Sequence, residues 1–198
     1  MSTHAAAPSP PLTAALVWLG LAIAVGASGV LAKVPSPGPQ LVILALGAAT
    51  VAAGTLLPGF RAWVDGLDLR LLVAPHAIRL VAGVVFLFLA SQGRMSPLFA
   101  RNAGWGDIVA ATLGLAVIAT GAPLTAGRRL AYLVWNVVGV LDFVVVLGTA
   151  AVVARRDPAS LGLLFHLPLS LVPTFIVPLL IASHVFVFRR LATARTAA

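Results

Sequence analysis

The stretch of residues 130–154 is almost wholly apolar and contains a single charged side chain, Asp142. About 20 apolar residues are enough for a helix to cross the hydrocarbon core of a bilayer. Backbone polar groups inside hydrocarbon must bond to one another, and a continuous apolar run of this length satisfies that need as a helix, not as a barrel strand. This one segment therefore predicts a chain that lives in a membrane.

The remaining composition agrees with this prediction. Of 198 residues, 61% are hydrophobic and only 9% are charged, whereas soluble domains carry about 25% charged residues. The fold class we predict is all-α, a polytopic membrane protein with a bundle of six transmembrane helices forming one domain over residues 1–198. The expected spans are residues 12–32, 40–57, 75–92, 107–123, 130–154 and 161–188.

The charged residues are unevenly distributed. The net charge is +8, from thirteen Lys and Arg against five acidic residues. The basic pairs Arg128-Arg129, Arg155-Arg156 and Arg189-Arg190 stand where apolar segments end, as residues flanking membrane spans do. No basic face is present, so we do not expect nucleic acid as a partner. Cysteine is absent, which excludes disulfides and thiolate sites.

An even number of spans places both termini on one side of the membrane. That side would carry eight basic residues and the other side five. The excess favours cytoplasmic termini. The eight are Arg61, Arg70, Arg79, Arg128, Arg129, Arg189, Arg190 and Arg195; the five are Lys33, Arg94, Arg101, Arg155 and Arg156.

The loop of residues 58–74 has apolar residues at helical spacing, with charged residues between them. This pattern predicts either a short helix lying at the membrane surface or a tight linker anchored by its aromatic residues. The sequence does not decide between them. The apolar residues are Phe60, Trp63, Val64, Leu67 and Leu71.

Polar residues recur at similar depth in three of the spans. With a rise of about 1.5 Å per residue, Arg79 and His184 lie about 6 Å from the terminus-bearing end of their helices. His76 lies at the rim, and Asn136 about 9 Å in. Asp142 lies about 18 Å in, near the midplane of a core about 30 Å thick. We therefore expect a polar pocket open to that half of the membrane.

The last span contains prolines at positions 168, 173 and 178. A helical proline leaves the carbonyl four residues earlier without its donor. Pro173 thus frees the carbonyl of Leu169, and Pro178 that of Thr174. Since Thr174 lies near the depth of Asp142, a protonated Asp142 could donate to that carbonyl or to the Thr174 hydroxyl.

Each polar residue also has a purely structural interpretation. Asp142 could form a hydrogen bond between helices, worth about 1 kcal/mol. The sequence supports this interpretation and a functional role equally. Asp107, after Gly104-Trp105-Gly106, is expected to cap a helix N-terminus. Arg79 is expected to extend towards the headgroups, and His76 to be a rim residue.

Part of the chain resembles small multi-span bacterial membrane proteins of unassigned function. The resemblance lies in the C-terminal half, in residues 100–116, 133–150 and 167–188. It is carried by Gly-Trp-Gly-Asp at 104–107, by Trp135-Asn136 with Asp142, and by the proline-spaced last segment with His184. It implies six helices in a bacterial inner membrane and supplies no activity.

Three functions remain open. In the first, the protein binds or translocates a small solute or an ion such as a proton. The residues we expect to serve it are Asp142, Asn136, His184, Arg79, His76, Thr174, Pro173 and Pro178.

In the second, the chain is a b-type membrane cytochrome with His76 and His184 as haem ligands and Arg79 near a propionate. In the third, it is a non-catalytic subunit or scaffold. No serine elbow or histidine–acid motif is visible and glutamate and cysteine are absent, so we do not expect an enzyme or a catalytic metal. The lipid bilayer is the expected partner, and homo-oligomerisation or a larger membrane complex is left open.

Overall fold

The computed structural model describes residues 10–193. Arg195, which entered the count of basic residues, lies outside them. All regular secondary structure in the described residues is helical, and no strand occurs among them. The α-helices are α1 (Pro10–Ser28), α2 (Gly38–Leu56), α3 (Pro58–Gly66), α4 (Leu69–Val73), α5 (Ile78–Ser91), α6 (Pro97–Ala119), α7 (Ala126–Arg156) and α8 (Val177–Thr193). Shorter 3-10 turns are η1 (Val30–Lys33), η2 (Ala74–Ala77) and η3 (Pro158–Phe165), and η4 (Val172–Ile176) is a π-helical turn.

Six helical segments in residues 10–193 are long and apolar enough to cross a membrane. They are Pro10–Ser28, Gly38–Leu56, Leu69–Ser91, Pro97–Ala119, Ala126–Arg156 and Val172–Thr193. The predictions of an all-helical fold and of six candidate spans are thus confirmed, and the first, second and fifth spans begin and end within about one helical turn of the expected positions.

The third span begins at Leu69, not at residue 75 as predicted. Asp68 caps it, since its side chain accepts a hydrogen bond of 2.8 Å from the Arg70 backbone amide. Pro75 does not open the helix but lies in the 3-10 turn η2, which joins α4 to α5. Asp and Asn caps satisfy otherwise free amides of a first turn, and that cap explains the earlier start.

The fourth span begins at Pro97, ten residues before the predicted start at 107. Ser96 caps α6 by accepting from the Phe99 amide, and Pro97 occupies the first turn, where its missing N–H is not needed. The last span begins at Val172, not 161, because residues 158–165 form the 3-10 helix η3.

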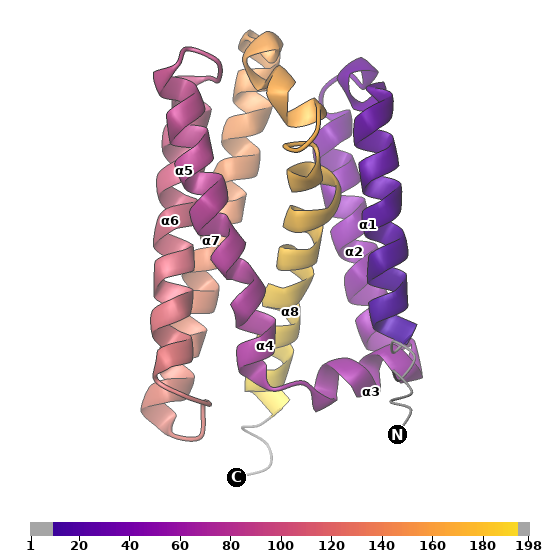
Figure 1. Cartoon of the computed structure of the whole chain (residues 1–198). Coiled ribbons are helices and arrows are strands. Elements are labelled where there is room, and N and C mark those ends of the chain that lie inside the picture. Colours follow the sequence, from indigo (N-terminus) through magenta and orange to yellow (C-terminus); the bar gives the residue numbers. More distant parts are fainter. Residues whose placement is uncertain (1–9, 194–198) are drawn as a thin grey trace, which may run out of the picture.

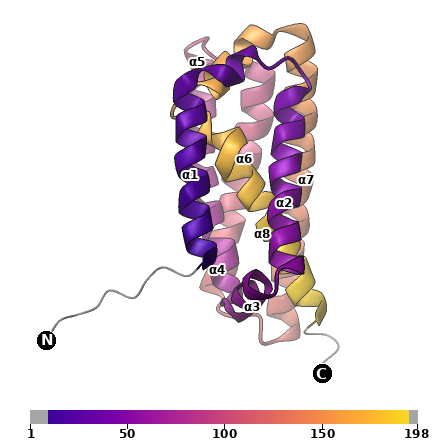
Figure 2. The ribbon, with the colours of Figure 1, turned by 90° about the vertical axis from the view of Figure 1, so that its right-hand side faces the viewer.

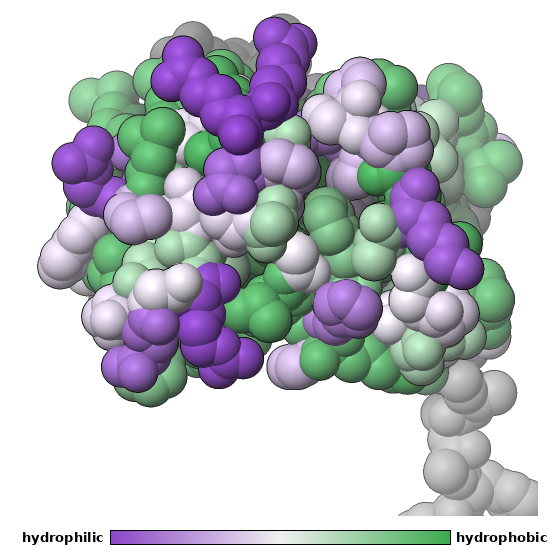
Figure 3. Space-filling view, turned by 90° about the horizontal axis from the view of Figure 1, so that it is seen from above, coloured by the Kyte–Doolittle hydropathy of each residue, from purple (hydrophilic) through white to green (hydrophobic). Residues whose placement is uncertain are grey.

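Figure 1 shows the bundle from the side. Helices α5, α6 and α7 lie together on one side, α1 and α2 lie on the other, and α8 runs between them. Half of the residues in an 18-residue apolar stretch of the span that contains α8 are buried, against 17% in the corresponding stretch of α1. Helix α1 begins and α8 ends at the same end of the bundle, which we call the terminal end (Figure 1). Figure 3 shows the opposite end, where hydrophilic residues are scattered among apolar ones.

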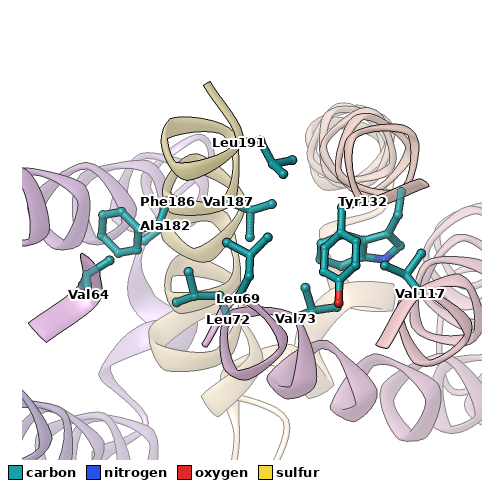
Figure 4. Close-up of a cluster of buried hydrophobic side chains, with 11 residues drawn as sticks. Val64, Leu69, Leu72, Val73, Val117, Tyr132, Ala182, Phe186, Val187 and Leu191 are labelled. Atoms are coloured by element: carbon teal, nitrogen blue, oxygen red, sulfur yellow. The ribbon is translucent and has the colours of Figure 1, made fainter. Parts of the chain in front are cut away.

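The loop of residues 58–74 contains a short helix, as one of the two predictions had it. Helix α3 lies across the terminal end between α2 and α4 (Figures 1 and 2). Val64 on α3 is buried whereas Trp63 is 40% exposed. Figure 4 shows the apolar cluster that Val64 joins, formed with side chains of α4, α6, α7 and α8. A second apolar cluster, including Phe86, Phe99 and Leu161, lies on α5, α6, α7 and η3.

Candidate functional site

Arg79 of α5 is the centre of a buried ion cluster. Its side chain is 2% exposed, and its Nε donates to an Asp107 carboxylate oxygen of α6 at 2.7 Å. Its Nη2 donates to the Asp142 carboxylate of α7. We call these three residues the ion triad. The expectation that Arg79 extends to the headgroups was wrong. The span begins at Leu69, so Arg79 lies about 15 Å from that start, and its contact with Asp142 places the two side chains at similar depth.

Asp107 does not cap a helix, contrary to the prediction. It lies in the middle of α6 and is buried. It was not predicted as a site residue because the fourth span was expected to begin there. The glycines beside Asp107 could have indicated that it faces a neighbouring helix, because Gly104 and Asp107 are three residues apart and share a helix face.

Glycines bring the three helices of the ion triad close together. A Cβ on Gly83 of α5 would lie 2.5 Å from the Gly104 carbonyl oxygen of α6, and a Cβ on Gly106 would collide with the Asp142 carboxylate. Gly83 is one turn from Arg79 on the same face. Only glycine at these positions therefore leaves room for the charged groups to meet.

Two histidines lie next to the ion triad. His76 of η2 and His184 of α8 are each 0% exposed, and their ring centroids are 4.4 Å apart. The Trp135 ring lies 5.0 Å from His76 and 5.1 Å from His184. Phe143 connects the pair to the ion triad, with its centroid 5.8 Å from His184 and 4.3 Å from the Arg79 guanidinium carbon. His76 was expected at the rim; it is buried because the third span begins earlier.

The hydrogen bonds of the two imidazoles define which nitrogens carry protons. Ser183 Oγ donates to the Leu72 carbonyl at 2.5 Å, so it accepts from His76 Nε2 at 3.4 Å. The Asn136 amide nitrogen donates to the His184 carbonyl at 3.0 Å, so its oxygen accepts from His184 Nδ1 at 2.6 Å. With neutral imidazoles, this assignment leaves a lone pair on His76 Nδ1 and on His184 Nε2.

Three buried nitrogens at this site lack a hydrogen-bond partner among the described residues: His76 Nδ1, His184 Nε2 and Arg79 Nη1. Buried polar groups are normally paired, and each exception calls for an explanation. A Cβ on Gly139 of α7 would collide with the His184 ring, so glycine is required beside it. Two acceptors and one donor thus stay unpaired in the interior of the bundle.

The prolines and Thr174 make their contacts with other parts of the chain and not with this cluster. Thr174 Oγ1 donates to the Ser170 carbonyl at 2.7 Å, and the Thr174 carbonyl accepts from the Trp18 indole of α1 at 2.9 Å. Pro178 lies against Gly47 of α2. The carbonyl freed by Pro178 therefore does find another donor, but that donor is Trp18 and not Asp142, which is paired with Arg79. Pro173 lies within the π-helical turn η4.

A haem between His76 and His184 does not fit this geometry. Metal–nitrogen bonds of about 2 Å would place two axial imidazole centroids roughly 6 Å apart with the porphyrin plane between them. The observed 4.4 Å is a direct ring contact. Within residues 10–193, no three His, Cys, Asp or Glu side chains group as metal ligands do.

Comparison with known proteins identifies a family but no activity. No curated protein and no solved structure matches the chain. One family model, described as a domain of unknown function (DUF8737), matches residues 36–192. That range excludes α1 and includes the ion triad, both histidines and Asn136. Because the match covers well over half of the chain, the protein belongs to the DUF8737 family.

Proposed function

We propose that this chain is a multi-pass protein of a bacterial inner membrane that binds a proton, or a small cation in its place, at the ion triad during translocation of an ion or small solute. The bilayer is the partner this requires, and the proposal leaves open whether the chain forms a homo-oligomer or joins a larger membrane complex. Cytoplasmic termini are part of the proposal. With Arg79 inside the bundle, six of the described basic residues remain at the terminal end, against five at the other end.

The observation that supports the proposal is the charge of the ion triad. One guanidinium faces two carboxyl groups, so full ionisation would leave an excess negative charge. An uncompensated charge in a low-dielectric interior costs several kcal/mol. A single proton on either carboxyl group removes the excess, and so would a bound monovalent cation.

The groups around the ion triad are suited to the transfer of a proton to and from its carboxyl groups. The Asp107 and Asp142 side chains are each 10% exposed, whereas Arg79 is 2% exposed, so the carboxyl groups are less enclosed than the cation that pairs them. The lone pairs on His76 and His184 offer further acceptors beside the ion triad. Imidazoles that can change between the neutral and the protonated form serve as proton relays in other proteins.

Proton flux into proteoliposomes tests the proposal. Purified protein is reconstituted with a pH-sensitive dye inside, and an inward potential is imposed with potassium and valinomycin. We expect faster acidification than in empty vesicles, reduced at least tenfold by Asp142→Asn or Asp107→Asn. Asp157→Asn removes the same charge at an exposed position and should leave the flux unchanged.

Equal rates in wild-type and empty vesicles under proton, Na⁺ and K⁺ gradients would reject ion translocation. The ion triad would then be a structural tie, as in the hypothesis of a non-catalytic subunit or scaffold. That hypothesis has its own test, which is whether a stable membrane partner co-purifies with the chain.

A further inference from the structure

A large apolar cavity lies on the side of α8 facing away from the ion triad. Its volume is about 450 Å³, and its walls come from α1, α2, α3, η2 and α8 with the adjoining residues of α4. Figure 2 looks towards α1 and α2, with α8 behind them. Ala15 and Trp18 line it from α1, Ala49 and Ala53 from α2, and Leu180 from α8.

The lining offers water little to bind. Two hydroxyl groups face the cavity, and both already donate to backbone carbonyls: Thr50 to Leu46 at 2.8 Å and Ser183 to Leu72 at 2.5 Å. Water in a cavity needs about two to four polar partners. Protein interiors are otherwise close-packed, so a space of this size among membrane helices suits hydrocarbon.

The terminal end of the cavity carries an excess of positive charge. Arg189 of α8 donates to the carbonyl of Gly54, which lines the cavity, at 2.9 Å. It also pairs with Asp65 of α3, and Arg61 lies 3.7 Å from the same carboxylate. Two guanidinium groups thus share one acid at the level where α3 lies across the bundle. An anionic headgroup complements that charge.

We propose that this cavity holds one acyl chain of an anionic phospholipid from the leaflet at the terminal end, with its phosphate beside Arg61 and Arg189. The apolar lining selects the chain and the charge excess selects the headgroup. Trp63, 40% exposed on α3, lies at the same edge, where interfacial tryptophan is usual. This site is independent of ion binding by the ion triad.

Photolabelling tests the proposal. The full chain is placed in nanodiscs that contain a trace of phosphatidylglycerol with a diazirine near the end of one chain, and labelled peptides are mapped by mass spectrometry. We expect labels on cavity residues such as Leu46 and Leu179 at several times the level found on the exposed face of α7. A phosphatidylcholine probe of the same chain should label them about threefold less.

A matched pair of variants separates the cavity from the general lipid surface. Ala49 lines the cavity and its neighbour Ala48 does not, and both are exposed positions of α2. Ala49→Phe should reduce cavity labelling at least fivefold, and Ala48→Phe should leave it unchanged. Arg61→Gln should remove the preference for phosphatidylglycerol, whereas Arg94→Gln, at the other end, should not.

Several outcomes would overturn the proposal. Cavity labelling no stronger than on α7 would mean that no chain is seated there. Equal loss in Ala48→Phe and Ala49→Phe would show that a surface effect was measured. Labelling that does not depend on the headgroup, or cross-links showing that residues 1–9 or a second copy fill the cavity, would reject the phospholipid as occupant.

Discussion

The two sides of α8 differ in how they are filled. Facing α7 and η2, α8 contributes His184 to a close-packed polar cluster in which glycines make room for individual side chains. Facing α1 and α2, it borders an apolar cavity. Ser183 belongs to both sides, since it lines the cavity and also contacts His76. Substitutions on the side of His184 should therefore act through specific side-chain contacts, and substitutions on the side of the cavity through the volume that they fill.

The largest effect should follow loss of the cation on the polar side. Arg79→Met leaves two buried carboxyl groups without their partner, and breaking a buried ion pair costs roughly 3 to 5 kcal/mol. Unfolding of the purified protein in mixed micelles would measure this loss. As a control, the triple variant Arg79→Met, Asp107→Leu, Asp142→Leu removes all three charges and should recover most of the stability while abolishing ion flux. Equal stability of the single variant and wild type would contradict the buried pairing.

The next effect concerns the glycine beside His184. Gly139→Ala places a methyl group where the imidazole lies, and such overpacking costs about 1 to 3 kcal/mol. A methyl group added at Gly148, on the same helix, would meet nothing within 4 Å, so Gly148→Ala should be neutral or up to about 1 kcal/mol more stable. The same micelle unfolding assay compares them. Similar behaviour of the two variants would mean that α7 and α8 are not in close contact at Gly139.

Filling the cavity should have a smaller effect, of opposite sign. Ala49→Leu adds apolar volume, and each buried methylene is worth about 0.8 kcal/mol. We expect a gain of about 1 to 2 kcal/mol in delipidated detergent, which shrinks in anionic nanodiscs because the added side chain competes with the lipid chain. Ala48→Leu serves as the comparison in both media. A gain of the same size in both media would argue against a bound chain.

The smallest effect should come from Asp68, at the membrane surface. The Arg70 side chain, which donates to Asp68, lowers the pKa of that carboxyl group from its usual 3.8. Because the folded-state pKa is the lower one, the stabilisation is present above pH 3.8 and is lost as pH falls through the folded value. Asp68→Ala should cost at most about 1 kcal/mol near neutral pH, a difference that disappears in acid. A constant difference across that pH range would exclude the ionised cap.

The membrane fold was predictable from the apolar segments, since length and hydropathy alone decide whether a helix can span a bilayer. Helix starts were less predictable. Leu69 and Pro97 begin their spans because of caps at Asp68 and Ser96, and both lie outside the continuous apolar runs. Those shifts changed the inferred depth of Arg79 and the role of Asp107.

The candidate site was therefore only partly foreseen. Asp142, Asn136 and His184 were chosen because polar groups in apolar spans are costly, and the structure brings their neighbourhoods together with Arg79 and His76. Thr174 was grouped with them by depth, yet depth does not fix which way a side chain points around the helix. Contacts such as Trp18 to Thr174 join distant parts of the chain and leave no local pattern in the sequence.

The most direct test of the central claim is the infrared spectrum of the purified protein near neutral pH, compared with those of Asp107→Asn and Asp142→Asn. A proton shared by the ion triad predicts one protonated carboxylic acid, seen as a C=O stretching band that shifts in D₂O, in wild type and its absence in both variants. A wild-type spectrum with ionised carboxylates only, and no Na⁺ or K⁺ dependence, would contradict the account.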